Sequence, residues 1–97
     1  MKFFYSTVFF LFVTARFSIA QTPTSGNPII KGWYADPEAA IFKDRYWIYP
    51  TYSDKYEKQV FFDAFSSKNL VQWKTHHKIL DTAAIKWARR AMWAPAI

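Results

Sequence analysis

The sequence predicts an all-β fold, because short apolar segments of strand length alternate with polar segments typical of turns. The apolar segments contain many aromatic and β-branched residues, which are enriched in strands. The four expected strands are residues 38–43, 46–52, 59–66 and 71–76. Four short antiparallel strands that follow one another along the chain are what a single blade of a β-propeller requires.

The segments between the expected strands are rich in turn-forming residues. Asp44-Arg45 is interpreted as a tight turn, residues 53–58 as a polar loop and residues 67–69 as a second turn. Pro50 falls inside the second expected strand. Because proline cannot donate a hydrogen bond to a strand ladder, we expect it at a sheet edge or at a bulge.

Residues 83–91 are expected to form a short helix after the fourth strand. Asp81 or Thr82 could cap its amino end, and its basic residues lie toward the carboxyl end, where the helix dipole favours them. Pro95 would end any helix that continued. Trp87 in this segment is interpreted as a core residue rather than a residue that contacts a substrate.

Residues 1–20 have the features of a secretory signal peptide. Lys2 precedes an apolar run over residues 3–15, and Ser18-Ile19-Ala20 fits a small-x-small cleavage site. The run is shorter than the about 20 residues of a membrane-spanning helix. The sequence therefore predicts a secreted, extracellular protein with no membrane association after cleavage, and a retained anchor is the alternative. Residues 21–27 would then form a polar lead-in.

Composition and charge limit the classes of partner. The chain has 13 Lys and Arg against 7 Asp and Glu, and it has no cysteine. Most basic residues are scattered, and the group Lys86, Arg89 and Arg90 is interpreted as a solvated surface, so no nucleic acid is expected as a partner. His76 and His77 lack further ligands at useful spacing. We therefore expect them on the surface, with no metal and no cofactor.

Asp36 is the leading candidate for a catalytic residue. Pro37 favours an extended geometry for it, and residues 39–42 (Ala-Ala-Ile-Phe) are typical of a buried strand. The carboxylate should therefore be held at the start of a strand rather than on a mobile loop. Trp33 and Tyr34 beside it could form a stacking wall for a sugar ring. The alternative is an Asp-Pro turn before an ordinary core strand.

Four motifs follow one another along the chain, and together they resemble a known family. They are Gly32 to Phe42, Tyr46 to Tyr49, Phe65 to Trp73 and Met92 to Ile97. In this order they resemble the amino-terminal part of a family 43 glycoside hydrolase. The resemblance implies a five-bladed β-propeller in the full-length protein. Residues 28–97 would then be an incomplete propeller domain, with the first blade and the start of the second.

The same resemblance implies a function for individual residues. The family's activity is hydrolysis of O-glycosyl bonds in arabinose- or xylose-containing polysaccharides, with inversion, so a plant cell-wall polysaccharide or oligosaccharide is the implied partner. Asp36 matches the general base, and Trp93 matches the tryptophan of a Trp-Ala-Pro segment in the substrate pocket, with Trp33 and Tyr34. The family's general acid lies in a later blade. Residues 1–97 alone would therefore be inactive.

The sequence departs from the family pattern at two positions. Asn69 stands where the family often has an aspartate, and Ala96 stands where it commonly has a carboxylate, which affects the sugar specificity more than the class. The strand pattern stops at Ile97 inside a motif, so the chain is interpreted as a truncated product. Two other functions stay open: a non-catalytic carbohydrate-binding propeller fragment, and a fragment without activity.

Overall fold

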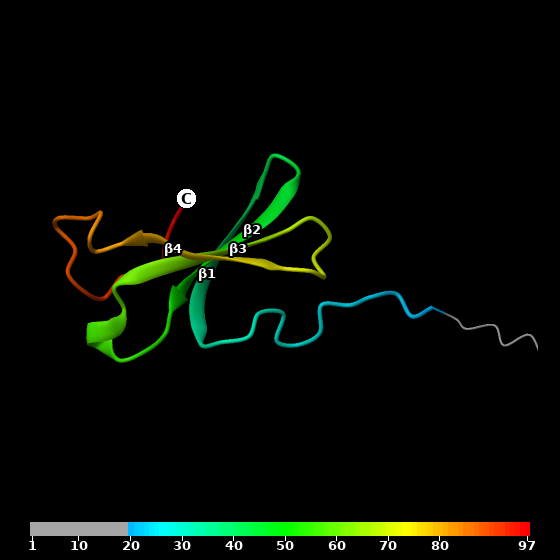
Figure 1. The fold of residues 1–97 in the computed structure, drawn as a ribbon, viewed down its shortest axis with the longest axis horizontal. Coiled ribbons are helices and arrows are strands. Elements are labelled where there is room, and N and C mark those ends of the chain that lie inside the picture. The colour runs from blue at the N-terminus through cyan, green and yellow to red at the C-terminus, as the bar shows by residue number, and fades with distance from the viewer. Residues whose placement is uncertain (1–19) are drawn as a thin grey trace, which may run out of the picture.

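The computed structural model describes residues 20–97, which form one four-stranded antiparallel sheet (Figure 1). The strands are β1 (Tyr34–Phe42), β2 (Arg45–Tyr52), β3 (Phe61–Ser67) and β4 (Lys74–Asp81). Each strand pairs with the next one along the chain. The all-β prediction is confirmed, and the sheet has the meander topology of one propeller blade. The predicted signal peptide falls on residues 1–19, outside the described part of the chain, and on Ala20.

β1 is longer than predicted and contains Asp36. Tyr34 and Ala35 already pair with β2, and the pairing resumes at Glu38 after a register shift. Asp36 has φ 46°, in the left-handed region that aspartate tolerates better than most residues. Asp36 is the third residue of β1, so the prediction that a strand holds it near its start is confirmed. The extended geometry expected from Pro37 is wrong, as is the alternative of a turn before the strand, because the residue lies at a bulge within it.

Pro50 lies in the middle of the sheet, opposite this bulge. β2 pairs with β1 on one side and with β3 on the other, so it is not an edge strand. Tyr49 pairs with Glu38 and Thr51 pairs with Ala35, which leaves Pro50 facing the bulged residues of β1. The expectation of a bulge is confirmed and the alternative of an edge is wrong. A missing N–H is tolerated here because the ladder is already interrupted.

The connections differ from the predictions in detail. The first turn consists of Lys43 and Asp44, and Arg45 already belongs to β2. The loop before β3 contains a short 3-10 helix, η1 (Tyr56–Lys58). β3 starts two residues later than expected and extends one residue further. These shifts of one or two residues do not change which segments pair.

The turn between β3 and β4 is longer than predicted, and the fourth strand is displaced from residues 71–76 to β4. The side-chain oxygen of Asn69 accepts hydrogen bonds from the amides of Val71 and Gln72, at 3.0 and 2.9 Å. The hydroxyl of Ser67 accepts one from the amide of Asn69 at 3.2 Å. These side chains satisfy amides that would otherwise pair in a ladder, so the turn extends toward Lys74.

The helix predicted over residues 83–91 is absent from the described structure. Asp81 does accept hydrogen bonds from the amides of Ala83 and Ala84, as a capping residue would, at 2.9 and 3.1 Å. The chain then turns back toward the sheet (Figure 1), and the amide of Met92 donates to the carbonyl of Gln59 at 2.9 Å. This long-range bond outweighs the local helix propensity, which is a weak determinant.

The core of residues 20–97 is small. Its buried apolar residues are Ala64 and Phe65 of β3, together with Met92. Trp87 is 87% exposed, so the prediction that it is a core residue is wrong. No helix within residues 20–97 has the length and apolar character needed to cross a membrane.

Candidate active site

The bulge of β1 presents Asp36 to solvent. A bulge bends its strand and re-aims the adjacent side chains, and bulges are over-represented next to active sites. The side chain of Asp36 is exposed, so water can reach the carboxylate. This arrangement suits a group that must take a proton from a water molecule.

The Trp-Ala-Pro segment meets the sheet beside this bulge. The amide of Ala94 donates a hydrogen bond to the hydroxyl of Thr51 at 2.6 Å. Thr51 is only 3% exposed and pairs with Ala35, the residue before Asp36. The structure therefore brings two of the predicted site segments, which lie far apart in the sequence, to the same end of β2.

Trp93 is held at its polar edge while much of its ring stays accessible. Its indole N–H donates to the side-chain oxygen of Gln59, and its ring meets Tyr56 edge-on with centroids 5.7 Å apart. The residue is nevertheless 54% exposed. An indole that is fixed by its N–H and open elsewhere can offer a flat surface to a sugar.

Trp33 is the most accessible of the three predicted substrate-binding aromatics. It is 73% exposed, and its backbone carbonyl accepts a hydrogen bond from the amide of Ser53 at 2.9 Å. The backbone of Trp33 is thus tied to the chain that leaves β2, while its ring remains free to contact a ligand.

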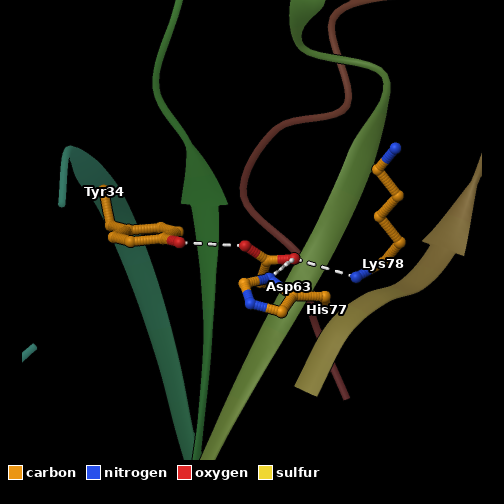
Figure 2. Close-up of polar contacts among 4 residues, drawn as sticks. All are labelled: Tyr34, Asp63, His77 and Lys78. Atoms are coloured by element: carbon orange, nitrogen blue, oxygen red, sulfur yellow. Dashed lines mark hydrogen bonds and ion pairs between the residues drawn. The ribbon is translucent and has the colours of Figure 1, made fainter. Parts of the chain in front are cut away.

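Tyr34 lies in a more constrained environment. Its ring packs edge-on against Tyr52 and Phe65, with centroid distances of 6.0 and 5.1 Å. A side chain at position 32 would collide with it, because an added Cβ on Gly32 would lie 2.6 Å from the Tyr34 ring. The hydroxyl donates a hydrogen bond to Asp63 at 2.9 Å (Figure 2).

Asp63 is a buried carboxylate that sequence reasoning did not select. It is 2% exposed and lies in β3. Burial, the hydrogen bond to Asp63 and the negative charge of Asp63 raise the pKa of Tyr34 to about 12. The available signal was a single carboxylate between Phe62 and Ala64, in the apolar part of the strand.

The two histidines occupy different environments. His76 is partly buried: its Nε2 lies 2.9 Å from the hydroxyl of Ser66, and its ring centroid lies 5.0 Å from that of Trp47. The surface prediction is therefore wrong for His76, because the ring covers Trp47. It is correct for His77, whose side chain is exposed and whose Nδ1 lies 3.6 Å from the Asp63 carboxylate. Within residues 20–97, no group of three potential metal ligands comes together.

Two cavities flank these residues. A cavity of about 630 Å³ lies between the sheet and the returning chain, lined by apolar side chains that include Phe62, Leu80 and Trp93. A smaller one of about 340 Å³ is lined in part by Pro37 and Pro50, on the two strands of the bulge. Asp36 lines neither cavity, so the candidate site is defined by the bulge and the neighbouring aromatic rings.

Comparison with known proteins places the chain in a family. The family model of the glycosyl hydrolases family 43 matches residues 25–97. The chain therefore belongs to this family of glycoside hydrolases. It is similar to the beta-D-galactofuranosidase xynD of Aspergillus niger, with 55% identity over 74 residues. The match covers 75% of this chain and 22% of that relative, so the chain spans about a fifth of the relative's length.

Proposed function

We propose that the protein containing this segment is a secreted glycoside hydrolase that cleaves O-glycosyl bonds in arabinose- or xylose-containing polysaccharides with inversion. Membership of family 43 supports the reaction class. The observation that carries the proposal is the exposed carboxylate of Asp36 on the β1 bulge, at the end of β2 where the segment around Ala94 is attached.

The proposed role of Asp36 is that of a general base. In an inverting hydrolase, one carboxylate takes a proton from water while that water attacks the anomeric carbon. A second, protonated carboxyl group on the other face of the sugar protonates the leaving oxygen, about 6.5–9.5 Å from the base. Asp63 does not suit this second role, because it is buried and already accepts hydrogen bonds. The acid is therefore proposed to come from another part of the protein.

The aromatic rings are proposed to bind the sugar. Trp33 and Trp93 expose ring surface, and Tyr34 adds a ring edge close to the bulge. A sugar stacked on such rings would be held while Asp36 activates water. Plant cell-wall polysaccharides are the proposed source of substrate.

The relative's name favours one choice within this substrate class. The Aspergillus niger protein is named for galactofuranosides, and galactofuranose shares its five-membered ring with arabinofuranose. We therefore place arabinofuranosides first among the substrates to be tested, with galactofuranosides as the principal rival and xylopyranosides third.

The test uses the complete protein and nitrophenyl glycosides of these three sugars. Release of nitrophenol identifies the substrate, and nuclear magnetic resonance of the first product identifies its anomeric configuration. We expect one furanoside to be hydrolysed with inverted configuration. Retention would contradict the proposed mechanism. Binding of a polysaccharide without hydrolysis of any substrate would support the alternative, a non-catalytic carbohydrate-binding protein.

Secretion is tested separately. Expression of the complete gene in a secreting host should release protein into the medium with Gln21 as its first residue, because cleavage is proposed after Ala20. Mass spectrometry of the amino-terminal peptide makes the measurement. Protein that retains residues 1–20 and stays with the membranes would support the anchor instead.

A further inference from the structure

Between each two neighbouring strands, the regular pairing is interrupted, and the three interruptions lie side by side across the sheet. Between β1 and β2 the register shifts between Ala35 and Glu38. Between β3 and β4 it shifts between Phe62 and Ala64. Between β2 and β3 the register is constant, but Tyr49 and Pro50 form no pair between the pairs Ile48 with Phe65 and Thr51 with Phe62. The interruption forms an irregular band across the sheet, which consists of Asp36-Pro37, Pro50, Asp63 and His77-Lys78-Ile79.

Side-chain hydrogen bonds of Asp63 replace backbone pairing in this band. One carboxylate oxygen accepts a hydrogen bond from the amide of Lys78 at 2.8 Å. Lys78 has φ 49°, so its amide is turned out of the ordinary strand geometry. The other oxygen accepts a hydrogen bond from the hydroxyl of Tyr34 at 2.9 Å. Figure 2 shows the Tyr34 hydroxyl reaching across β2 to Asp63, so this one side chain connects β1, β3 and β4.

Because Asp63 is buried, the loss of one of these hydrogen bonds should be costly. A buried charged group needs hydrogen-bonding partners, and removing one partner leaves an unsatisfied charge. Tyr34 is also the residue from which β1 enters the bulge, since only Ala35 separates it from Asp36. Fixing the Tyr34 hydroxyl therefore fixes the strand immediately before the proposed base.

We propose that Asp63 is a positioning residue for Asp36. It acts through the Tyr34 hydroxyl and holds β1 at the bulge, where ladder hydrogen bonds are missing, in the orientation that brings the Asp36 carboxylate to its water molecule. This inference rests on the proposed function of Asp36. Positioning of this kind matters because a displacement of about 1 Å can reduce a rate by about 100-fold.

The test compares single variants of the complete protein. Tyr34→Phe removes the hydroxyl and keeps the ring that is predicted to contact the sugar, and Asp63→Asn removes the charge at nearly constant volume. We expect both to lower kcat by about 10- to 100-fold, with little change in KM, at a temperature where each variant is fully folded. Tyr52→Phe is the matched control, because within residues 20–97 its hydroxyl hydrogen-bonds to the half-buried Asp54, at 3.3 Å, and not to Asp63. The control should keep the parent kcat.

A double-mutant cycle identifies the route by which Asp63 acts. If Asp63 works through Asp36, the combination Asp63→Asn with Asp36→Asn should be hardly slower than Asp36→Asn alone. Losses that multiply would overturn the inference, as would parent-like kcat in both single variants. If Asp63→Asn does not fold, Tyr34→Phe decides the question. A parent-like rate for Asp36→Asn alone would overturn the proposed function itself, which separates the two failures.

Discussion

The two halves of the sheet are built differently. Toward the turn between β1 and β2, the pairs run without interruption from Glu38 with Tyr49 to Phe42 with Arg45. Toward the other end, the ladders break at the irregular band, and the side chain of Asp63 supplies the connections. The regular half is held by backbone hydrogen bonds, and the irregular half carries the proposed base. The comparison shows that irregular backbone geometry and candidate chemistry coincide in this sheet, as bulges beside active sites commonly do.

The first prediction asks whether the regular half can hold the sheet together without further protein. Residues 21–97 alone should not unfold cooperatively, because three buried apolar residues form the core and the edge strands β1 and β4 have unpaired sides. Circular dichroism during heating, with the molecular mass measured by light scattering, makes the test. A sharp cooperative transition in a monomeric sample would show that the regular ladders suffice.

The second prediction concerns the aromatic surface beside the irregular band. In the complete protein, Trp93→Ala should weaken sugar binding by about 1–3 kcal/mol, judged from the transfer free energy of a large side chain. Phe42→Ala is the matched control: this ring is 62% exposed and lies at the turn of the regular half, away from the bulge, so its loss should not change the affinity. If Trp93 were an ordinary core residue, its loss would cost about 3–5 kcal/mol of stability and leave the affinity unchanged. Calorimetric titration and melting temperatures on the same samples distinguish these results.

The third prediction concerns the regular half and has the smallest expected effect. Burial of His76, assisted by the positive charges of Lys74 and Arg45, lowers its pKa from the ordinary value of 6.5. The folded state therefore favours the neutral ring. The contribution of the neutral His76 ring to the stability of the folded state is complete above the pKa of this residue in the unfolded chain. It declines as the pH falls from 6.5 toward the lower pKa of His76 in the folded state.

The melting temperature of the complete protein should accordingly fall between pH 7 and pH 5, and His76→Gln should reduce that slope. Equal slopes in the parent and in His76→Gln would show that the contacts of His76 with Ser66 and Trp47 do not contribute.

The sequence predicted the central part of the first three strands and only the start of β4. Strand-length apolar runs separated by turn residues determine both the type of element and its partners. The prediction failed where hydrogen bonds outside the strand ladders capture backbone amides. Asn69 extends the turn before β4 in this way, and the bond from Met92 to Gln59 replaces the expected helix. The bonds of Asn69 are local and compete with the expected strand, whereas the bond from Met92 to Gln59 joins residues whose proximity depends on the completed sheet.

The candidate site, like the fold, could be predicted only in part from the sequence. The Asp-Pro sequence singled out Asp36 as a candidate, and the family resemblance singled out Trp93 without placing its segment beside the bulge. Asp63 was not selected, because its partners Tyr34 and Lys78 lie 29 and 15 residues away in the sequence. Only the register of the four strands brings these three residues together.

The rate of Asp36→Asn in the complete protein tests the central claim most directly. The variant should retain the parent melting temperature and hydrolyse the preferred furanoside about 10²–10⁴-fold more slowly, the usual effect of removing a general base. Asp44→Asn, at the turn of the regular half, is the matched control: this aspartate side chain is 76% exposed, and its loss should not change the rate. Hydrolysis by Asp36→Asn at the parent rate would contradict the assignment of the bulge as the catalytic position.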